Sequence, residues 1–299
     1  MSTPATVLVT GGTGFLGSNL VRRLAGTAHP LVVVKRSSSK LARLAGLESR
    51  IRCYDVDRVP MRAIFDEHPI GVIVHCATNY GRRTEPPTDI IEANLLLPLS
   101  LLQLGERHGS SVFINSDTIL DKRVNHYSLS KHQFLEWLPV FSERLVCANV
   151  ALEHFYGPYD DPSKFVSHVV QRLLTDDPVL SLTPGGQRRD FVFIDDVVEA
   201  FLTILEFSLG ATPGLYRYEV GTGASITIAD FVRLAKTLSA NERTRLDFGA
   251  LPYREREVME SHADVRSLLA LGWQPRVALR DGLCRTITLE REHLLSCAT

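Results

Sequence analysis

Short apolar runs separated by segments of helical spacing form the main pattern of the first half of the chain. Runs that read as buried strands cover residues 6–10, 31–34, 51–55, 71–78 and 112–114. Between these runs, apolar residues three and four positions apart, as in residues 18–25 and 89–104, predict helices. Strands that alternate with helices imply a parallel sheet with ligands at the carboxyl ends of its strands. We therefore expect an α/β fold with a doubly wound parallel (Rossmann) sheet.

The pattern changes after residue 145. A strand at residues 146–152 leads into a sharp turn, and the shorter elements that follow include no second glycine-rich turn. This later part reads as a smaller α/β substrate-binding lobe, interleaved with the first domain. The expected division assigns residues 1–157 and 191–212 to the Rossmann domain, and residues 158–190 and 213–299 to the lobe.

Composition narrows the class of protein. The 299 residues carry a net charge of -1, with 44% hydrophobic and 22% charged residues, as in an ordinary globular protein. The charges are scattered, so the sequence indicates no charged patch that would bind nucleic acid or a membrane surface. No apolar run approaches the roughly 20 residues of a membrane span. We expect no secretion signal from the first residues, and the five cysteines lack metal-ligand spacing. We expect a cytoplasmic protein without a metal site.

A glycine-rich turn, Gly11-Gly-Thr-Gly-Phe-Leu-Gly17, joins the first strand to the first helix. In such a turn Gly11 permits a tight bend, Gly14 lets the backbone approach a pyrophosphate, and Gly17 allows the helix to pack closely on the strand. The alternative is a tight structural turn without a ligand. The order of strand, turn and helix, with a second strand about 20 residues on, favours a dinucleotide site.

The second strand ends in the basic turn Lys35-Arg-Ser-Ser-Ser-Lys40. Enzymes that use NAD usually place an Asp or Glu here for the ribose 2'-hydroxyl, whereas cations and hydroxyls suit a 2'-phosphate. We therefore expect NADP(H), with a solvated basic loop as the alternative. Asp55, at the end of the third strand, is expected to accept a hydrogen bond from the adenine amine. His75 reads as a packed histidine and receives no chemical role.

Tyr127 and Lys131 lie four residues apart on a predicted helix and share one face. An ammonium favours a nearby phenolate, so Lys131 is expected to lower the pKa of Tyr127 and make it a proton carrier near neutral pH. Ser116, which follows the fifth strand, is expected to hydrogen-bond the same substrate oxygen. This set suits alcohol and ketone chemistry. An isolated pair of this spacing is more often a surface pair, but here it accompanies the glycine turn.

With these motifs placed, nearly the whole chain resembles an extended short-chain dehydrogenase/reductase, the group that modifies nucleotide-linked sugars. The resemblance implies that Ser116, Tyr127 and Lys131 are the catalytic set, and that Lys131 also holds the nicotinamide ribose. It implies cofactor contacts from Gly11, Thr13, Gly14, Phe15, Leu16, Gly17, Lys35, Arg36, Ser37, Ser38, Asp55, Val56, Cys76, Ala77, Thr78, Tyr127 and Lys131. It implies substrate contacts from Asn79, Tyr80, Asp117, Thr118, His154, Arg189 and Arg254, with the two arginines gripping the nucleotide diphosphate.

Within this family, residues 115–118 (Asn-Ser-Asp-Thr) and 127–131 (Tyr-Ser-Leu-Ser-Lys) are most similar to the CDP-sugar 4-reductases called abequose and paratose synthases. The basic turn is similar to the NADP-binding turn of GDP-mannose 4,6-dehydratases. These resemblances imply NADPH as cofactor and reduction of the 4-keto group of CDP-4-dehydro-3,6-dideoxyglucose. The partner is then a nucleotide sugar, with CDP favoured, and a homodimer is one option for the assembly.

Two departures and two alternatives accompany this interpretation. His154 stands where the family has an Asn, and the segment between Ser116 and Tyr127 is short. A nucleotide-sugar 4-epimerase that retains NAD(P) would use the same catalytic set, and a non-catalytic nucleotide-sensing protein would keep the fold. Related dehydratases place an Asp-Glu pair after the active-site hydroxyl, whereas Ser116 is followed here by Asp117 and Thr118.

Overall fold

The computed structural model describes residues 4–82 and 85–298, and within the last turn the side chains of residues 297 and 298 are not described. The chain divides into two compact units. Unit 1 comprises residues 1–151, 198–218 and 270–272, and unit 2 comprises residues 152–197, 219–269 and 273–299. Sequence patterning had placed the corresponding boundaries after residues 157, 190 and 212. Residues 1–3, where no secretion signal was expected, lie outside the described residues.

Unit 1 is built on a seven-stranded sheet with the strand order β11-β6-β5-β4-β1-β2-β3. The bounds are β1 (Thr6–Thr10), β2 (Leu31–Lys35), β3 (Ile51–Asp55), β4 (Ile70–His75), β5 (Val112–Thr118), β6 (Val146–Leu152) and β11 (Gly214–Val220). The pairs β3–β2, β2–β1, β1–β4 and β4–β5 are parallel. The order reverses between β1 and β4, which is the point where open α/β sheets bind ligands. The predicted doubly wound parallel sheet is confirmed.

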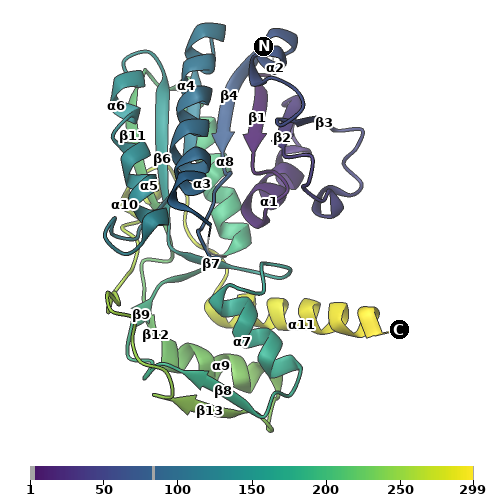
Figure 1. Ribbon diagram of the computed structural model, residues 1–299, viewed down its shortest axis with the longest axis vertical. Helices are drawn as coiled ribbons and strands as arrows, with labels where there is room; N and C mark the ends of the chain where they lie inside the picture. The colour runs from purple at the N-terminus through teal and green to yellow at the C-terminus, as the bar shows by residue number, and fades with distance from the viewer. Residues whose placement is uncertain (1–3, 83–84, 299) are drawn as a thin grey trace. The chain divides into compact units, whose positions relative to one another are not determined.

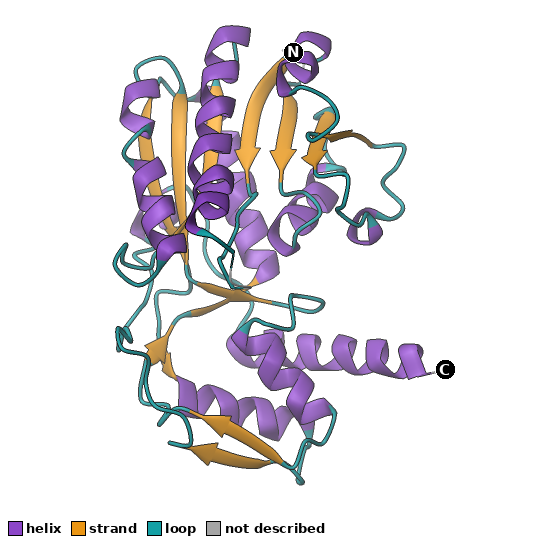
Figure 2. Ribbon diagram, viewed as in Figure 1, coloured by secondary structure: helices purple, strands orange, loops and turns teal. Residues whose placement is uncertain are grey.

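Helices cover both faces of this sheet (Figures 1 and 2). Their bounds are α1 (Phe15–Leu24), η1 (Ala42–Leu44), α2 (Met61–Glu67), α3 (Pro87–Ile91), the π-helical turn η2 (Glu92–Leu96), α4 (Leu97–His108), α5 (His126–Leu135), α6 (Leu138–Phe141) and α8 (Ile194–Gly210). On one face, α1 and α8 are joined by an ion pair of 2.9 Å between Arg23 and Glu199. Among the described residues, we find no helix with the length and apolarity needed to cross a membrane.

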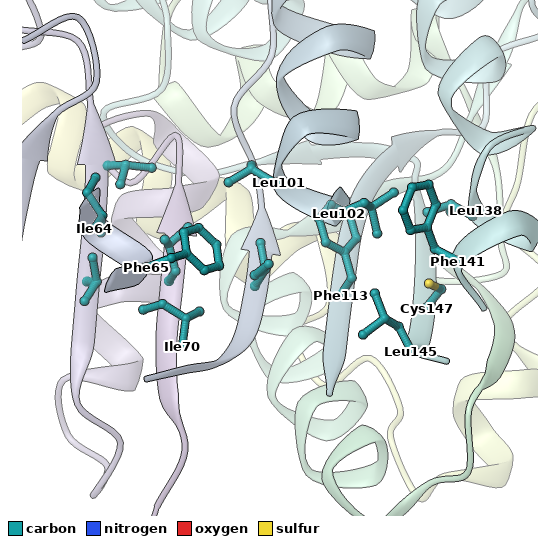
Figure 3. Close-up of a cluster of buried hydrophobic side chains, with 14 of the residues drawn as sticks. Ile64, Phe65, Ile70, Leu101, Leu102, Phe113, Leu138, Phe141, Leu145 and Cys147 are labelled. Carbon is teal, nitrogen blue, oxygen red and sulfur yellow. The ribbon is translucent and has the colours of Figure 1, made fainter. Parts of the chain in front are cut away.

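The core of unit 1 lies between the sheet and the layer formed by α2, α4, α5 and α6. Side chains from these helices meet strand residues such as Phe113 of β5 and Cys147 of β6, and all of them are buried (Figure 3). The rings of Phe113 and Phe134 lie 6.0 Å apart. Burying this apolar surface stabilises the layer and fixes α5 against the sheet.

Strand β5 is longer than the sequence indicated. The polar cluster that starts at Asn115 was expected to end the strand, but β5 continues through Thr118. The reason lies on the neighbouring strand β6, where Asn149 accepts a hydrogen bond from the Asn115 amide at 2.7 Å and donates one to Asp117 at 2.8 Å. Because these buried polar side chains are paired, they do not have to leave the sheet.

The described part of unit 2 is built from pairs of short strands and from helices. Its bounds are β7 (His154–Tyr156), α7 (Phe165–Leu174), β8 (Val179–Leu182), β9 (Arg188–Arg189), β10 (Phe191–Phe193), β12 (Ile226–Thr227), α9 (Ile228–Ser239), β13 (Arg245–Phe248), α10 (Arg266–Ala270) and α11 (Leu279–Ala298). The pairs are β7–β10, β9–β12 and β8–β13. Phe191 and Phe231 stack at 4.0 Å, and the buried Asp190 carboxylate accepts hydrogen bonds from Thr222 and Gly223. These contacts tie the short elements together.

We predict that Phe113→Ala destabilises the protein by about 3–5 kcal/mol, because it leaves a cavity in the core of unit 1. Val140→Ala is the matched control, since Val140 is 62% exposed and its truncation should cost no more than about 0.5 kcal/mol. Urea unfolding followed by circular dichroism measures both changes. Equal losses in the two variants would show that this cluster is not the stabilising core.

Candidate active site

The glycine turn between β1 and α1 is closed on itself. Gly11 has a φ of 65°, and its carbonyl accepts a hydrogen bond of 2.9 Å from the Gly14 N–H. A Cβ placed on Gly17 would lie 2.2 Å from the Gly11 carbonyl oxygen, so only glycine fits there. The next residues, Phe15 and Leu16, are the buried start of α1. The N–H groups at the start of a helix suit a pyrophosphate.

The basic turn after β2 is already neutralised in part. Lys35 forms an ion pair with Asp55, and the Lys35 side chain is only 9% exposed. The two residues are register partners on the parallel strands β2 and β3, which explains the pairing. Lys35, which was expected to bind a 2'-phosphate, thus contacts Asp55, which was expected to bind the adenine. The main-chain N–H of Val56 donates to the Lys35 carbonyl at 2.8 Å and fixes this corner.

The remaining residues of the basic turn are more open. Arg36 and Ser38 are exposed. Ser37 donates from its main-chain N–H, at 2.7 Å, and from its hydroxyl to the carboxylate of Asp57. Arg43 of η1 donates to the Thr13 carbonyl at 3.4 Å, which places its guanidinium beside the glycine turn. Arg43 and Asp57 were not predicted as site residues. Asp57 is a charged residue two positions after β3, which is the signal that could have found it, whereas Arg43 lies far from both neighbouring strands in the sequence.

The end of β4 is locked to the end of β1. The Thr10 hydroxyl accepts hydrogen bonds from the N–H groups of Cys76 at 3.2 Å and Ala77 at 3.1 Å. The Thr10 hydroxyl therefore donates its own proton in a hydrogen bond to Nδ1 of His75, 2.9 Å away. His75 is fully buried, and burial holds its pKa well below the usual value. This is a packed histidine, as predicted, and it positions the loop that carries Cys76 and Ala77.

Asn94 fixes the next part of that loop. It lies fully buried in the π-helical turn η2, and its carbonyl accepts hydrogen bonds from the Thr78 hydroxyl at 3.0 Å and the Asn79 N–H at 2.8 Å. Its amide donates to the Asn79 carbonyl and to the Ser130 hydroxyl of α5, each at 2.9 Å. One side chain thus ties the loop after β4 to the helix that carries Tyr127 and Lys131.

Helix α5 begins with a capping box in which Asn125 and Ser128 satisfy each other's main-chain N–H groups. From this fixed start, Lys131 projects into the sheet, where it is 1% exposed and donates to the Ser116 carbonyl at 2.9 Å. Thr118, the last residue of β5, lies close enough to Tyr127 to lower the pKa of its phenol, a smaller effect than the raising of that pKa by burial. Thr118 therefore lies near Tyr127, whereas Ser116 contributes its main-chain carbonyl to Lys131.

Aromatic and cationic groups flank Tyr127. The ring of Tyr80 lies 4.9 Å from that of Tyr127, and the guanidinium of Arg82 lies 4.6 Å from the Tyr80 ring centroid. Both come from the loop that Asn94 fixes. Asn79, Tyr80, Thr118 and Tyr127, all predicted site residues, are thus held in one part of unit 1.

The electrostatics of the pair differ from the sequence-based expectation. Burial holds the pKa of Tyr127 well above its usual value, and Tyr80 and Asp117 raise it further. Burial also lowers the pKa of Lys131, to about 8. The expected lowering of the Tyr127 pKa by Lys131 is therefore wrong. The physical reason is that removing a phenolate from water outweighs the favourable interactions nearby. Tyr127 is therefore a neutral phenol at neutral pH.

The predicted residues of unit 2 form their own cluster. Arg189 is buried and ion-paired with Glu257, and Arg254 lies close enough to lower the Arg189 pKa, a smaller effect than that of burial. Nδ1 of His154 lies 2.9 Å from the buried carboxylate of Glu153. Glu153 and Glu257 were missed by sequence reasoning, because their partners become visible only in the folded unit. Among the described residues no group of His, Cys, Asp or Glu side chains could hold a metal ion.

Comparisons with known proteins give consistent matches. The sequence profile of the NAD dependent epimerase/dehydratase family matches residues 7–221. CDP-abequose synthase from Salmonella typhimurium is 33% identical over 287 residues, which cover 93% of this chain and 95% of that protein.

Two solved structures are also similar. UDP-glucose 4-epimerase from Thermotoga maritima, crystallised with UDP-glucose, has a TM-score of 0.85 and 26% identity, covering 97% of this chain and 99% of that one. UDP-glucose 4-epimerase from Thermus thermophilus, in complex with NAD, has a TM-score of 0.79 and 25% identity, with 96% and 99% covered.

We predict that Gly17→Ala abolishes measurable binding of a nicotinamide dinucleotide, because the new Cβ displaces the Gly11 carbonyl and opens the turn. Gly210→Ala is the control, since no atom lies within 4 Å of a Cβ built there. Fluorescence titration with reduced dinucleotide measures binding in both variants. Wild-type affinity in Gly17→Ala would remove the glycine turn from the cofactor site.

Proposed function

The chain belongs to the NAD dependent epimerase/dehydratase family, and from this premise we propose that it uses NADPH to reduce the 4-keto group of a nucleotide-linked deoxysugar. We propose CDP-4-dehydro-3,6-dideoxyglucose as the substrate. The observation that carries the proposal is the anchoring of α5 at the end of β5 by the buried Lys131, which donates to the Ser116 carbonyl and shares its helix with Tyr127, in a chain 33% identical to a CDP-abequose synthase. A protonated phenol next to a hydroxyl is suited to receive a carbonyl oxygen.

The residues fit a nicotinamide dinucleotide. At Gly17 a Cβ would collide with the main chain of Gly11, so the turn keeps its shape only with glycine there. The start of α1 offers N–H groups for the pyrophosphate. The loop of Cys76 and Ala77 packs against Gly11, since a Cβ there would lie 2.6 Å from the Ala77 nitrogen. When bound, the cofactor supplies the hydride. Lys131, whose charge also affects His75, is the proposed ligand of the nicotinamide ribose.

In the proposed reaction, Tyr127 gives its proton to the substrate oxygen as the carbonyl is reduced. We propose that the Thr118 hydroxyl, which lies near Tyr127, donates a second hydrogen bond that stabilises the developing negative charge. Ser116 and Lys131 hold the end of β5 and α5 together. The substrate's diphosphate is assigned to Arg189 and Arg254, and its other polar contacts to Asn79, Tyr80 and His154.

A nucleotide-sugar 4-epimerase that retains its cofactor is the second candidate. Two contacts favour it: the ion pair of Lys35 with Asp55, and the hydrogen bonds of Ser37 to Asp57, which both bring a carboxylate to the turn proposed for a 2'-phosphate. The exposed Arg36 is then the cation proposed to favour NADPH. The similarity to UDP-glucose 4-epimerase of Thermotoga maritima points the same way.

The reaction assay separates these functions. We expect the enzyme to consume one NADPH for each CDP-4-dehydro-3,6-dideoxyglucose, to prefer NADPH to NADH, and to leave CDP-glucose unchanged. NADPH absorbance and mass spectrometry of the sugar measure the three outcomes, with Tyr127→Phe as the inactive control. A keto product from CDP-glucose would indicate a dehydratase, and sugar conversion without net NADPH loss would indicate an epimerase.

We predict that Thr118→Val lowers kcat by a factor on the order of 100, because it removes the hydrogen-bond donor at Tyr127 without a large change of shape. Ser116→Ala should lower kcat much less, since the contact of Ser116 with Lys131 is made by its main-chain carbonyl. Cofactor titration of both variants verifies that the dinucleotide site is intact. A larger loss of kcat in Ser116→Ala than in Thr118→Val would contradict this assignment. It would indicate that Ser116 polarises the carbonyl, as the sequence predicted.

A further inference from the structure

Lys131 presents an electrostatic problem that the proposed mechanism leaves open. Its side chain is 1% exposed, and the hydrogen bond that fixes its Nζ goes to the neutral carbonyl of Ser116. An ammonium removed from water is stable only when an opposite charge lies close by. The residue after Ser116 is an aspartate, and its carboxylate is also buried, at 6% exposure.

The Asp117 carboxylate is held in place from two sides. One oxygen accepts a hydrogen bond of 2.8 Å from the Thr118 N–H, and the other accepts one of 2.8 Å from the Asn149 amide. Asn149 is itself fixed by the Asn115 amide at 2.7 Å. Asn115, Asp117 and Asn149 therefore form a buried polar chain across β5 and β6. Side chains alternate along a strand, so Asp117 lies on the face of β5 opposite to Ser116 and Thr118.

We infer that Asp117 is a positioning residue that acts through Lys131. Its carboxylate, fixed by Asn149 and by the main chain of Thr118, is the counter-ion that keeps the Lys131 ammonium charged inside the site. The inference rests on the proposed function in placing Lys131 in the catalytic set, and it replaces the substrate contact expected for Asp117 from the sequence.

The charges around Lys131 are consistent with this role. Burial lowers the Lys131 pKa to about 8, and Asp117 and then Cys76 oppose that lowering. His75, on β4, is held neutral by burial and by the Lys131 charge. Burial raises the Asp117 pKa, and Lys131 is the first of the groups that counteract it. Each of the two buried charges thus favours the ionised form of the other.

The direction of the pH effect follows. Lys131 carries its charge below its pKa and loses it as the pH rises through about 8. Asp117→Asn removes a group that raises this pKa, so the charge should be lost at lower pH. An opposite charge at close range shifts a pKa by about one to three units, so the change should be about one unit or more. Asp117→Glu retains the charge and should retain most of the wild-type value.

The test is an NMR titration of the full chain labelled with ¹³C at lysine Cε, without substrate. Lys131→Arg identifies the Lys131 signal. We expect its titration midpoint to fall by about one unit or more in Asp117→Asn, to recover in Asp117→Glu, and to stay unchanged in Asp66→Asn, which removes an exposed carboxylate of α2. An unchanged or higher midpoint in Asp117→Asn would overturn the inference.

Two further measurements complete the test. If Asp117→Asn does not fold, Asp117→Ser also removes the carboxylate and should lower the Lys131 midpoint in the same way; no change there would contradict the counter-ion role. In the reductase assay, the alkaline fall of kcat/KM should move to lower pH in Asp117→Asn by the same shift. A wild-type chain that reduces no 4-keto sugar would refute the proposed function, whereas the titration would still decide the role of Asp117.

Discussion

The burial of the Lys131 ammonium at the carboxyl ends of β4 and β5 is the constraint on which the site depends. A charge at 1% exposure has to be compensated by groups that do not move, and we assign this role to the Ser116 carbonyl, which accepts its hydrogen bond, and to the nearby Asp117 carboxylate. The polar chain from Asn115 to Asn149 and Asp117 explains why polar residues continue inside β5. The same compensation allows Tyr127, one turn earlier on α5, to sit as a neutral phenol against Thr118.

The rest of the site follows the same principle at the neighbouring strand ends. Thr10 satisfies two main-chain N–H groups and His75, and Asn94 satisfies the loop after β4 together with Ser130 of α5. These side chains are buried and carry no chemistry of their own. They hold the glycine turn, the loop of Tyr80 and the helix of Tyr127 in fixed positions, which a reaction that needs hydride and proton transfer to one carbonyl requires.

The fold and part of the candidate site could be predicted from the sequence because their signals are local. The glycine turn, the strand–helix alternation and the Tyr127–Lys131 spacing each lie within a short segment, and the family resemblance rests on them. The failures involve partners distant in sequence. Asn149 keeps β5 intact from 32 positions beyond Asp117, and Lys35 meets Asp55 only through the register of β2 and β3. The direction of the Tyr127 pKa depends on burial, which no spacing reveals.

The most direct test of the reductase assignment follows the hydride itself. The enzyme would be incubated with CDP-4-dehydro-3,6-dideoxyglucose and NADPH dideuterated at the nicotinamide 4-position, and the sugar product analysed by NMR and mass spectrometry. The reductase account predicts one deuterium at the sugar 4-carbon for each NADPH oxidised, and none elsewhere in the sugar. Product without deuterium at that carbon, formed while the NADPH concentration stays constant, would contradict it.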